Sequence, residues 1–159
     1  MILFFPHLLR ENRPEENGGE FLWILKSCGN LSRRTMPLPK KLNVTVEEIR
    51  PGYARVSKTV LPDETNPAGT AHGGLFLTLT DIASGSAAAA HGHVAATVSE
   101  DYHYLRGALA GDKMTAVARE VKCGRTLCVF EVQITNQDGV LLGVGNCTYF
   151  IKDRLLPLE

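Results

Sequence analysis

The stretch TNPAGTAHGGLFLTLTDIASG, residues 65–85, decides the fold. Its first residues are rich in Asn, Pro and Gly, which are typical of turns. From Gly73 to Ala90, apolar side chains recur at helical spacing and predict one long amphipathic helix with a single carboxylate, Asp81, in its middle. The stripe expected to face the core consists of Leu75, Phe76, Leu79, Ile82, Ala83, Ala87 and Ala90.

Strand patterns lie on both sides of this helix, and no second long helix follows it. The six strand candidates are residues 42–49, 53–60, 94–105, 112–122, 125–135 and 140–151. Residues 135–139, TNQDG, are typical of a hairpin turn. Two strands, one helix and four strands predict an α+β fold in which the helix packs against an antiparallel sheet.

The chain of 159 residues has the length of one ordinary domain. It carries 17 basic and 17 acidic residues, so its balanced charge gives no reason to expect a nucleic acid or an anionic membrane as partner. The longest apolar run, MILFFPHLL at residues 1–9, is too short for a membrane span. No basic segment precedes it, so we expect no signal peptide.

Three segments are expected along the chain. Residues 1–41 form an N-terminal extension with a short helix at about 20–29 and a connector that contains two prolines. Residues 42–152 form the main domain, and residues 153–159 form a C-terminal tail.

The four cysteines are Cys28, Cys123, Cys128 and Cys147. None forms a C-x-x-C pair, and no histidine completes a zinc-binding spacing, so we expect no metal. Cys128 and Cys147 lie in strand-like runs, where cysteine is usually a small buried apolar residue. Few, scattered cysteines favour a reducing compartment, which is the cytoplasm or, in a eukaryote, the mitochondrion.

The start of the helix suits an anionic oxygen. Gly73 and Gly74 leave the first-turn amides uncovered by side chains, and these N–H groups lie at the positive end of the helix dipole. A carbonyl oxygen that gains negative charge is stabilised at such a position. The alternative is that the two glycines only allow close backbone packing.

The mid-helix carboxylate has an unusual setting. Neighbours of Asp81 on its helix face are Leu77, Thr78, Gly85 and Ala88, which are mostly small or apolar. A carboxylate on a closely packed face indicates a specific role. The alternative is an aspartate that bonds a neighbouring backbone.

The spacing of these two features constrains any shared chemistry. Asp81 lies eight residues beyond Gly73, which is about 12 Å at ~1.5 Å per residue. A base must come within about 3 Å of the reacting atoms. Asp81 and Gly73 can therefore act on one carbonyl only if they come from two subunits, and the hypothesis requires a dimer.

The pattern N-x-x-G-x-x-H-G-G, followed by the acid eight residues after the first helix glycine, resembles the hotdog thioesterases with an HGG motif. These form the phenylacetyl-CoA thioesterase-like branch of the 4-hydroxybenzoyl-CoA thioesterase superfamily. The resemblance covers about residues 42–151. It implies a hotdog fold, with a central helix wrapped by a six-stranded antiparallel sheet, in a homodimer or homotetramer. It also implies hydrolysis of acyl-CoA thioesters to free acid and coenzyme A, without a cofactor other than the coenzyme A of the substrate.

The resemblance also implies roles for single residues. The amide of Gly73 matches the group that polarises the thioester carbonyl, and Asp81 matches the carboxylate that acts as general base or nucleophile. Asn66 matches the loop asparagine that positions the attacking water. Ser99 falls where some members carry a helping serine near the acid. His72 matches the motif histidine, which we take to support the loop and the oxyanion region.

Coenzyme A carries phosphates, so basic residues are expected around the site. Arg106, Arg119, Lys122 and Arg125 are the candidates, and Gly74 is grouped with them as a substrate contact. The alternative for the basic residues is ordinary solvated charge at the ends of strands.

Two other functions fit the same fold. A hotdog domain can bind acyl-CoA as a sensor or scaffold without turnover, although such a domain often lacks the acid that Asp81 supplies here. A hotdog hydratase or dehydratase needs a different His/Glu or Asp/His arrangement, which residues 71–81, AHGGLFLTLTD, do not supply.

Overall fold

The computed structural model describes residues 37–155. The short helix predicted at about residues 20–29 lies outside the described residues. The elements are α2 (Pro37–Lys41), β1 (Thr45–Arg50), β2 (Tyr53–Thr59), the 3₁₀ turn η1 (Pro62–Glu64), α3 (Gly73–Ala89), β3 (His93–Tyr104), β4 (Lys113–Cys123), β5 (Leu127–Thr135) and β6 (Leu141–Leu155).

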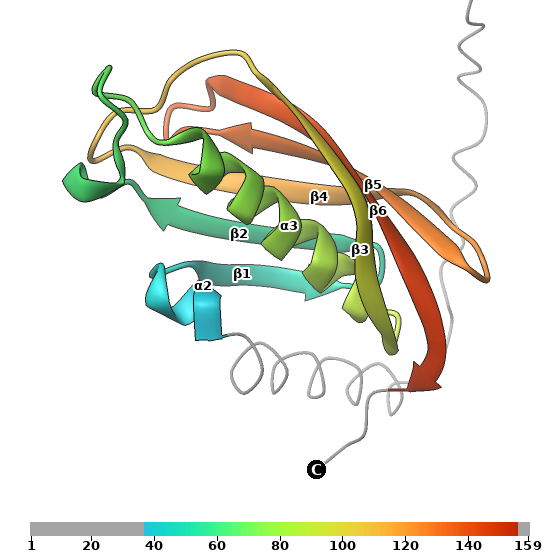
Figure 1. Cartoon of the computed structure of the whole chain (residues 1–159). Coiled ribbons are helices and arrows are strands. Elements are labelled where there is room, and N and C mark those ends of the chain that lie inside the picture. Colours follow the sequence, from blue (N-terminus) through green and yellow to red (C-terminus); the bar gives the residue numbers. More distant parts are fainter. Residues whose placement is uncertain (1–36, 156–159) are drawn as a thin grey trace, which may run out of the picture.

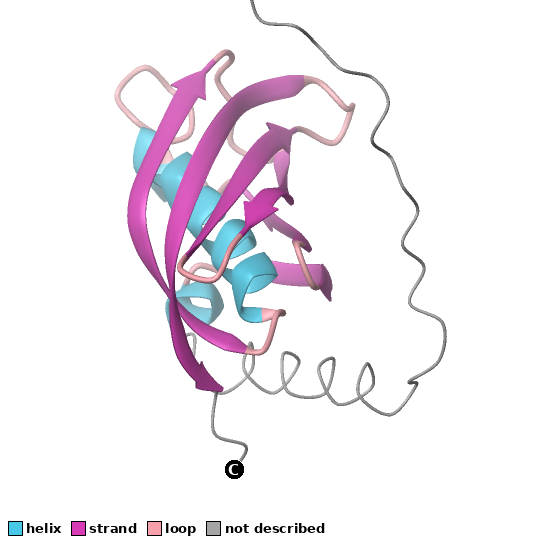
Figure 2. Cartoon of the chain, turned by 90° about the vertical axis from the view of Figure 1, so that its right-hand side faces the viewer, coloured by secondary structure: helices cyan, strands magenta, loops and turns pink. Residues whose placement is uncertain are grey.

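The six strands form one sheet in the order β1-β2-β4-β5-β6-β3, and all neighbouring strands run antiparallel. The long helix α3 crosses one face of this sheet (Figure 1). The strands curve around α3 so that the sheet wraps it (Figure 2). The predicted α+β hotdog architecture is confirmed.

Several predicted boundaries were wrong, and three of the differences are informative. The proline-containing connector ends in α2, because prolines near a helix start have a suitable fixed φ and the closing lysines suit the negative helix end. β1 begins at Thr45 rather than at residue 42, since the amides of residues 42–44 still bond carbonyls of α2 and Asn43 has a φ of 54°. β6 continues to Leu155, which takes residues 153–155 from the predicted tail into the sheet.

The apolar stripe of α3 is buried as predicted, with Leu79 fully inaccessible to solvent. It packs on the inner face of the sheet, where small alanines on β2 and β4 let the helix come close. The buried residues of the strands that face α3 include Ala54, Val56, Met114, Ala116, Ala118, Cys128, Phe130, Val132, Ile134 and Cys147. Thr80 and Ser84 are also buried, and each donates a hydrogen bond to the carbonyl four residues earlier, which satisfies their hydroxyls.

The register shifts at several points in the sheet, and the β-bulges in β3 and β4 matter most for the site because a bulge changes the face that later residues occupy. In β3 the register shifts between Thr97 and Ser99, and in β4 it shifts between Glu120 and Lys122. β3 is also an edge strand with exposed residues 96–99, and its free side pairs with no other described strand. A long edge of this kind is a template for pairing with another chain. Within residues 37–155, the helices are too short or too polar to cross a membrane.

We expect Leu79→Ala to lower the free energy of unfolding by about 2–5 kcal/mol, because it leaves a cavity beneath α3 where the side chain has no solvent exposure. Urea denaturation followed by circular dichroism measures this loss. The control Leu109→Ala removes a leucine that is 59% exposed and should change the free energy by about 0.5 kcal/mol or less. Equal losses in the two variants would contradict this account of the core.

Candidate active site

The start of α3 has one unused backbone donor. His72 is the N-cap, and its Nδ1 accepts a hydrogen bond of 3.0 Å from the Gly74 amide. The His72 carbonyl accepts a second bond, of 2.9 Å, from the Leu75 amide. Gly73 is thus the first-turn residue whose N–H has no acceptor within residues 37–155. His72 supports the helix start, and the Gly74 amide, which was grouped with the substrate contacts, is already engaged.

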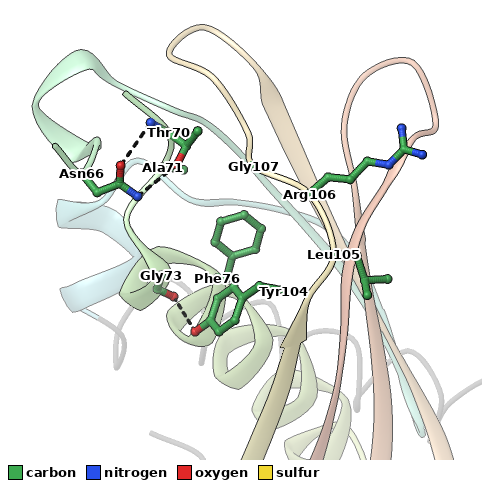
Figure 3. Close-up of a pocket in the computed structure, with 9 residues that line it drawn as sticks. All are labelled: Asn66, Thr70, Ala71, Gly73, Phe76, Tyr104, Leu105, Arg106 and Gly107. Carbon is green, nitrogen blue, oxygen red and sulfur yellow. Dashed lines mark hydrogen bonds between the residues drawn. The ribbon is translucent and has the colours of Figure 1, made fainter. Parts of the chain in front are cut away.

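An open pocket of about 380 Å³ adjoins the Gly73 end of α3 (Figure 3). It is lined by Asn66, Thr70, Ala71, Gly73, Phe76, Tyr104, Leu105, Arg106 and Gly107. The structure therefore brings together three of the predicted site residues, Gly73, Asn66 and Arg106. The Tyr104 hydroxyl donates to the Gly73 carbonyl at 3.2 Å, so this aromatic side chain covers the glycine from one side.

Asn66 organises the loop before α3. Its Oδ1 accepts hydrogen bonds from the amides of Ala68 and Thr70 at 2.9 and 3.3 Å. Its Nδ2 donates to the Thr70 hydroxyl at 3.0 Å, and Figure 3 shows both bonds to Thr70. An asparagine that bonds its own loop in this way fixes a turn. The side chain lines the pocket, but its hydrogen bonds are used within the loop.

Asp81 is half-buried in the middle of α3, and two hydroxyls orient it. Thr97 Oγ1 and Tyr149 OH each lie 2.9 Å from Asp81 Oδ1. The Tyr149 hydroxyl also lies 3.0 Å from Ser84 Oγ and 3.1 Å from the Asp81 carbonyl. The second carboxylate oxygen, Oδ2, makes no hydrogen bond to the part of the chain that the structure describes. The side chain of Asp81 is therefore held by other side chains, and one oxygen is left for chemistry.

Tyr149 is a permanent donor in this arrangement. Burial raises the pKa of its hydroxyl above the ordinary value of 10, and the negative charge of Asp81 adds to that rise. The hydroxyl therefore stays protonated at any physiological pH. Thr97 and Tyr149 were both missed from the sequence, since they lie 16 and 68 residues from Asp81 and a lone Thr or Tyr in a strand carries no motif.

Ser99 does not contact Asp81 within the chain. The bulge in β3 pairs Thr97 with Tyr149, Ser99 with Thr148, and Glu100 with the buried Cys147. Because cross-strand partners share a face of the sheet, Thr97 and Glu100 point toward α3 and Ser99 points away from it. The hydroxyl beside the acid is that of Thr97, two residues before the predicted serine.

Glu100 is a second carboxyl group close to Asp81. Its Oε1 is buried and has no hydrogen-bond partner among the described residues. Burial, and then the charges of Asp81 and Asp101, raise the pKa of Glu100 from 4.5 to about 7. The sequence offered only a weak signal for this residue, the acidic pair Glu-Asp inside a predicted strand.

The predicted basic residues do not all reach the pocket. Arg106 lines the pocket that adjoins the start of α3. Arg119 places its guanidinium 5.2 Å from the centre of the Tyr53 ring, and the next residue in β4, Glu120, bonds to His91 just beyond the C-terminal end of α3. Lys122 and Arg125 are exposed farther along the same hairpin. Within one chain these three basic residues lie away from Gly73 and toward the other end of the helix.

Comparisons with known proteins assign this arrangement to a family. The family model described as thioesterase superfamily matches residues 68–142. Human acyl-coenzyme A thioesterase 13 is 33% identical over 108 residues, which are 66% of this chain and 77% of the human protein. The chain belongs to the thioesterase superfamily. The resemblance found in the motif around residues 65–85 is confirmed.

The similarity to PaaI places this thioesterase in the PaaI-like branch. The acyl-coenzyme A thioesterase PaaI of Escherichia coli is 31% identical over 98 residues, which are 62% of this chain and 70% of PaaI. Its structure matches 86% of this chain and 99% of PaaI with a TM-score of 0.81 at 22% identity, which supports the fold. A protein from Streptococcus pneumoniae described as a hypothetical thioesterase, solved with coenzyme A, is 32% identical with a TM-score of 0.69, over 72% of this chain and 92% of that one.

We expect Glu100 to make the stability of this thioesterase depend on pH. Because the folded chain holds the pKa of Glu100 at about 7, well above 4.5, the folded state is favoured by protonation. That contribution is fully present below pH 4.5 and is lost as the pH rises through about 7. Urea midpoints measured across this range should fall with pH in the wild type, and Glu100→Gln should flatten the curve. The control Glu131→Gln, an exposed acid on β5, should keep the wild-type slope. An unchanged slope in Glu100→Gln would contradict the assignment.

Proposed function

We propose that this thioesterase hydrolyses acyl-CoA thioesters in a homodimer, with each active site built from two subunits. Asp81 of one subunit supplies the carboxylate, and the partner subunit's Gly73 supplies the N–H that stabilises the oxyanion. The observation that carries this proposal is that Gly73 and Asp81 lie apart from each other within one chain. The free amide of Gly73 lines a pocket that does not include Asp81, although both groups are prepared for chemistry.

The fixed geometry of α3 supports the division between subunits. Both residues lie on one continuous helix, so they are about 12 Å apart along its axis. The free edge of β3 offers a surface through which a second chain can continue the sheet. Two such dimers can form the homotetramer that the resemblance implies.

The chemistry needs only the groups named above. As a general base, Asp81 takes a proton from water, whose oxygen bonds to the thioester carbon while the carbonyl oxygen becomes negative beside the partner subunit's Gly73 N–H. The C–S bond then breaks, the electron pair leaves on the sulfur of coenzyme A, and the proton reaches the thiol or solvent. As a nucleophile, an oxygen of Asp81 instead bonds to the thioester carbon while the C–S bond breaks and coenzyme A leaves as the thiolate. Water then cleaves the resulting acyl anhydride to the free acid and restores the carboxylate. Thr97 and Tyr149 hold the carboxylate in either case.

Recognition of coenzyme A falls to the basic residues and the loop. We assign Arg106, at the pocket, to the phosphate groups, and Arg119, Lys122 and Arg125 to the same role in the assembled dimer. Asn66 holds the loop that positions the attacking water. Ser99 is exposed on the edge strand β3, and we assign it a helping role near the acid of the neighbouring subunit. The relatives named as acyl-CoA thioesterases, and the relative solved with coenzyme A, support this substrate class. The hydrolysis needs no further cofactor, and the proposed compartment is the cytoplasm.

Asp81→Asn should lower kcat for acyl-CoA hydrolysis by a factor of about 10²–10³ or more, because it removes the base or nucleophile and keeps the shape of the side chain. Thiol release from phenylacetyl-, 4-hydroxybenzoyl-, hexanoyl- and palmitoyl-CoA measures this loss. The control Asp63→Asn changes an exposed acid of η1 and should retain full activity. Tight binding of acyl-CoA by the wild type without any thiol release would overturn the proposed hydrolysis and favour an acyl-CoA sensor or scaffold.

Mixing two inactive variants should restore activity if the site is shared. Gly73→Pro removes the amide while keeping a helix-compatible φ at the first helical position, and Gly73→Ala is the matched control that keeps the N–H. In a mixed dimer of Asp81→Asn and Gly73→Pro, one site contains both defects and the other contains none. Random exchange of subunits should therefore return about a quarter of wild-type activity, half of the dimers being mixed with one intact site each. No recovery after the subunits have exchanged, in a mixture that light scattering shows to be dimeric, would contradict the shared site.

A further inference from the structure

A second group of reactive side chains lies at the other end of α3. His91, Glu120, Cys123 and Cys128 form this cluster, and one potential ligand atom from each lies within 4.8 Å of the others. His91 is ten residues beyond Asp81, which corresponds to about 15 Å along a helix axis. None of the four residues has a part in the hydrolysis proposed above, so we call this group the distal cluster.

The bulge in β4 brings the distal cluster onto the core face. Without it, Glu120 and Cys123 would alternate to opposite faces of the sheet. The register shift instead pairs Glu120 with Phe130 and Cys123 with Cys128, and both of these partners are fully buried. Glu120 and Cys123 therefore face the same side as the two buried residues, toward the end of α3.

Contacts around the distal cluster hold the acid and the imidazole in place. His91 Nε2 lies 2.6 Å from Glu120 Oε2, and each side chain is 27% exposed. Gly52, with a φ of 72°, leaves room for the glutamate, because a Cβ at Gly52 would lie 2.8 Å from Glu120 Oε2. The Glu120 amide also donates to the Gly52 carbonyl at 2.8 Å. The Glu120 carboxylate thus packs against the turn that contains Gly52.

The four groups suit a divalent cation of the zinc type. Two cysteine sulfurs, one imidazole nitrogen and one carboxylate oxygen are ligands that Zn²⁺ takes in tetrahedral sites, where ligand atoms lie roughly 3–4 Å apart. The spread of 4.8 Å is close to that arrangement, so small side-chain rotations suffice to close it. The negative end of the α3 dipole, which precedes His91, further favours a positive ion.

Cys123 and Cys128 are joined by a disulfide in the structure, and their Cα atoms are 4.0 Å apart in directly paired positions. We propose that the reduced form of this pair, together with His91 and Glu120, binds one Zn²⁺ ion, and that the disulfide and the metal site exclude each other. A dithiol reductant transfers two electrons and two protons to the disulfide, which opens to two thiols while the reductant closes to its own disulfide. Zn²⁺ then displaces the two thiol protons and binds the thiolates.

The inference concerns a site apart from the hydrolytic centre and does not depend on the proposed activity. When bound, the ion would join the end of α3 to the β4–β5 hairpin and stabilise the folded chain by mass action. The redox state of the surroundings would then decide whether the distal cluster contains a bound metal ion or the disulfide between Cys123 and Cys128.

The test uses the full chain carrying Cys28→Ser, so that the described cysteines are the only thiols present. The protein is stripped of metal, reduced with a dithiol and titrated with Co²⁺ and then with Zn²⁺. We expect one Co²⁺ per chain, with the thiolate charge-transfer band and the visible bands of tetrahedral cobalt, displaced by one Zn²⁺. The same protein after oxidation of the disulfide should show neither band.

Matched variants separate the distal cluster from adventitious binding. Cys123→Ser, His91→Gln and Glu120→Gln should each weaken Zn²⁺ binding, by about 100-fold or more for the cysteine. Cys147→Ser removes a buried thiol outside the cluster and should leave binding unchanged. Circular dichroism of the metal-free variants shows whether each one folds, and the two variants that keep both thiols make the test independent of the disulfide. Absence of a stoichiometric site in the reduced chain, or equal Zn²⁺ affinity in the wild type and the His91 and Glu120 variants, would overturn the proposal and leave the cysteine pair a simple covalent link.

Discussion

The rigid rise of one α-helix is the constraint on which the rest of this molecule depends. α3 runs without a break from Gly73 to Ala89, and its apolar stripe is locked against the sheet. Groups at its start, middle and end therefore keep fixed separations along one axis. The start carries the free amide, the middle carries the oriented carboxylate, and the end leads to the distal cluster. Because the helix is rigid, the groups at these three positions cannot come together within one chain, and each position has its own chemistry.

The β-bulges in β3 and β4 have a similar role in the sheet. In a regular strand, residues alternate strictly between the core face and the outer face. The bulge in β3 turns Glu100 toward the core beside Asp81, and the bulge in β4 turns Cys123 toward the core beside His91. Both polar groups lie under α3, one near its middle and one at its end. The sheet thus supplies ionisable side chains to a helix whose own buried residues are apolar or carry only hydroxyl groups.

The sequence predicted the fold well because its signals are local. Apolar periodicity located α3 to within one residue, and turn residues separated the strands. It predicted Asp81 and Gly73 as a pair because both belong to one motif. It could not predict Thr97 and Tyr149 at the carboxylate, since these contacts depend on the register of β3 and β6. It also gave no sign of the distal cluster, because a search by spacing cannot see that a bulge places Glu120 and Cys123 on one face.

The donor at the helix start is a backbone group, whereas the carboxylate belongs to a side chain. The two halves of the proposed site therefore differ in how easily a mutation removes them. Almost any replacement of Asp81 removes the carboxylate. At position 73, only proline removes the N–H. An added Cβ would lie 3.3 Å from the hydroxyl of Tyr104, a half-exposed side chain that would have to shift by only a few tenths of an ångström. Genetic drift can therefore erase the acid far more easily than the amide. Descendants of such a chain that lose catalysis would be expected to keep an intact anion-binding helix start, ready to be used again.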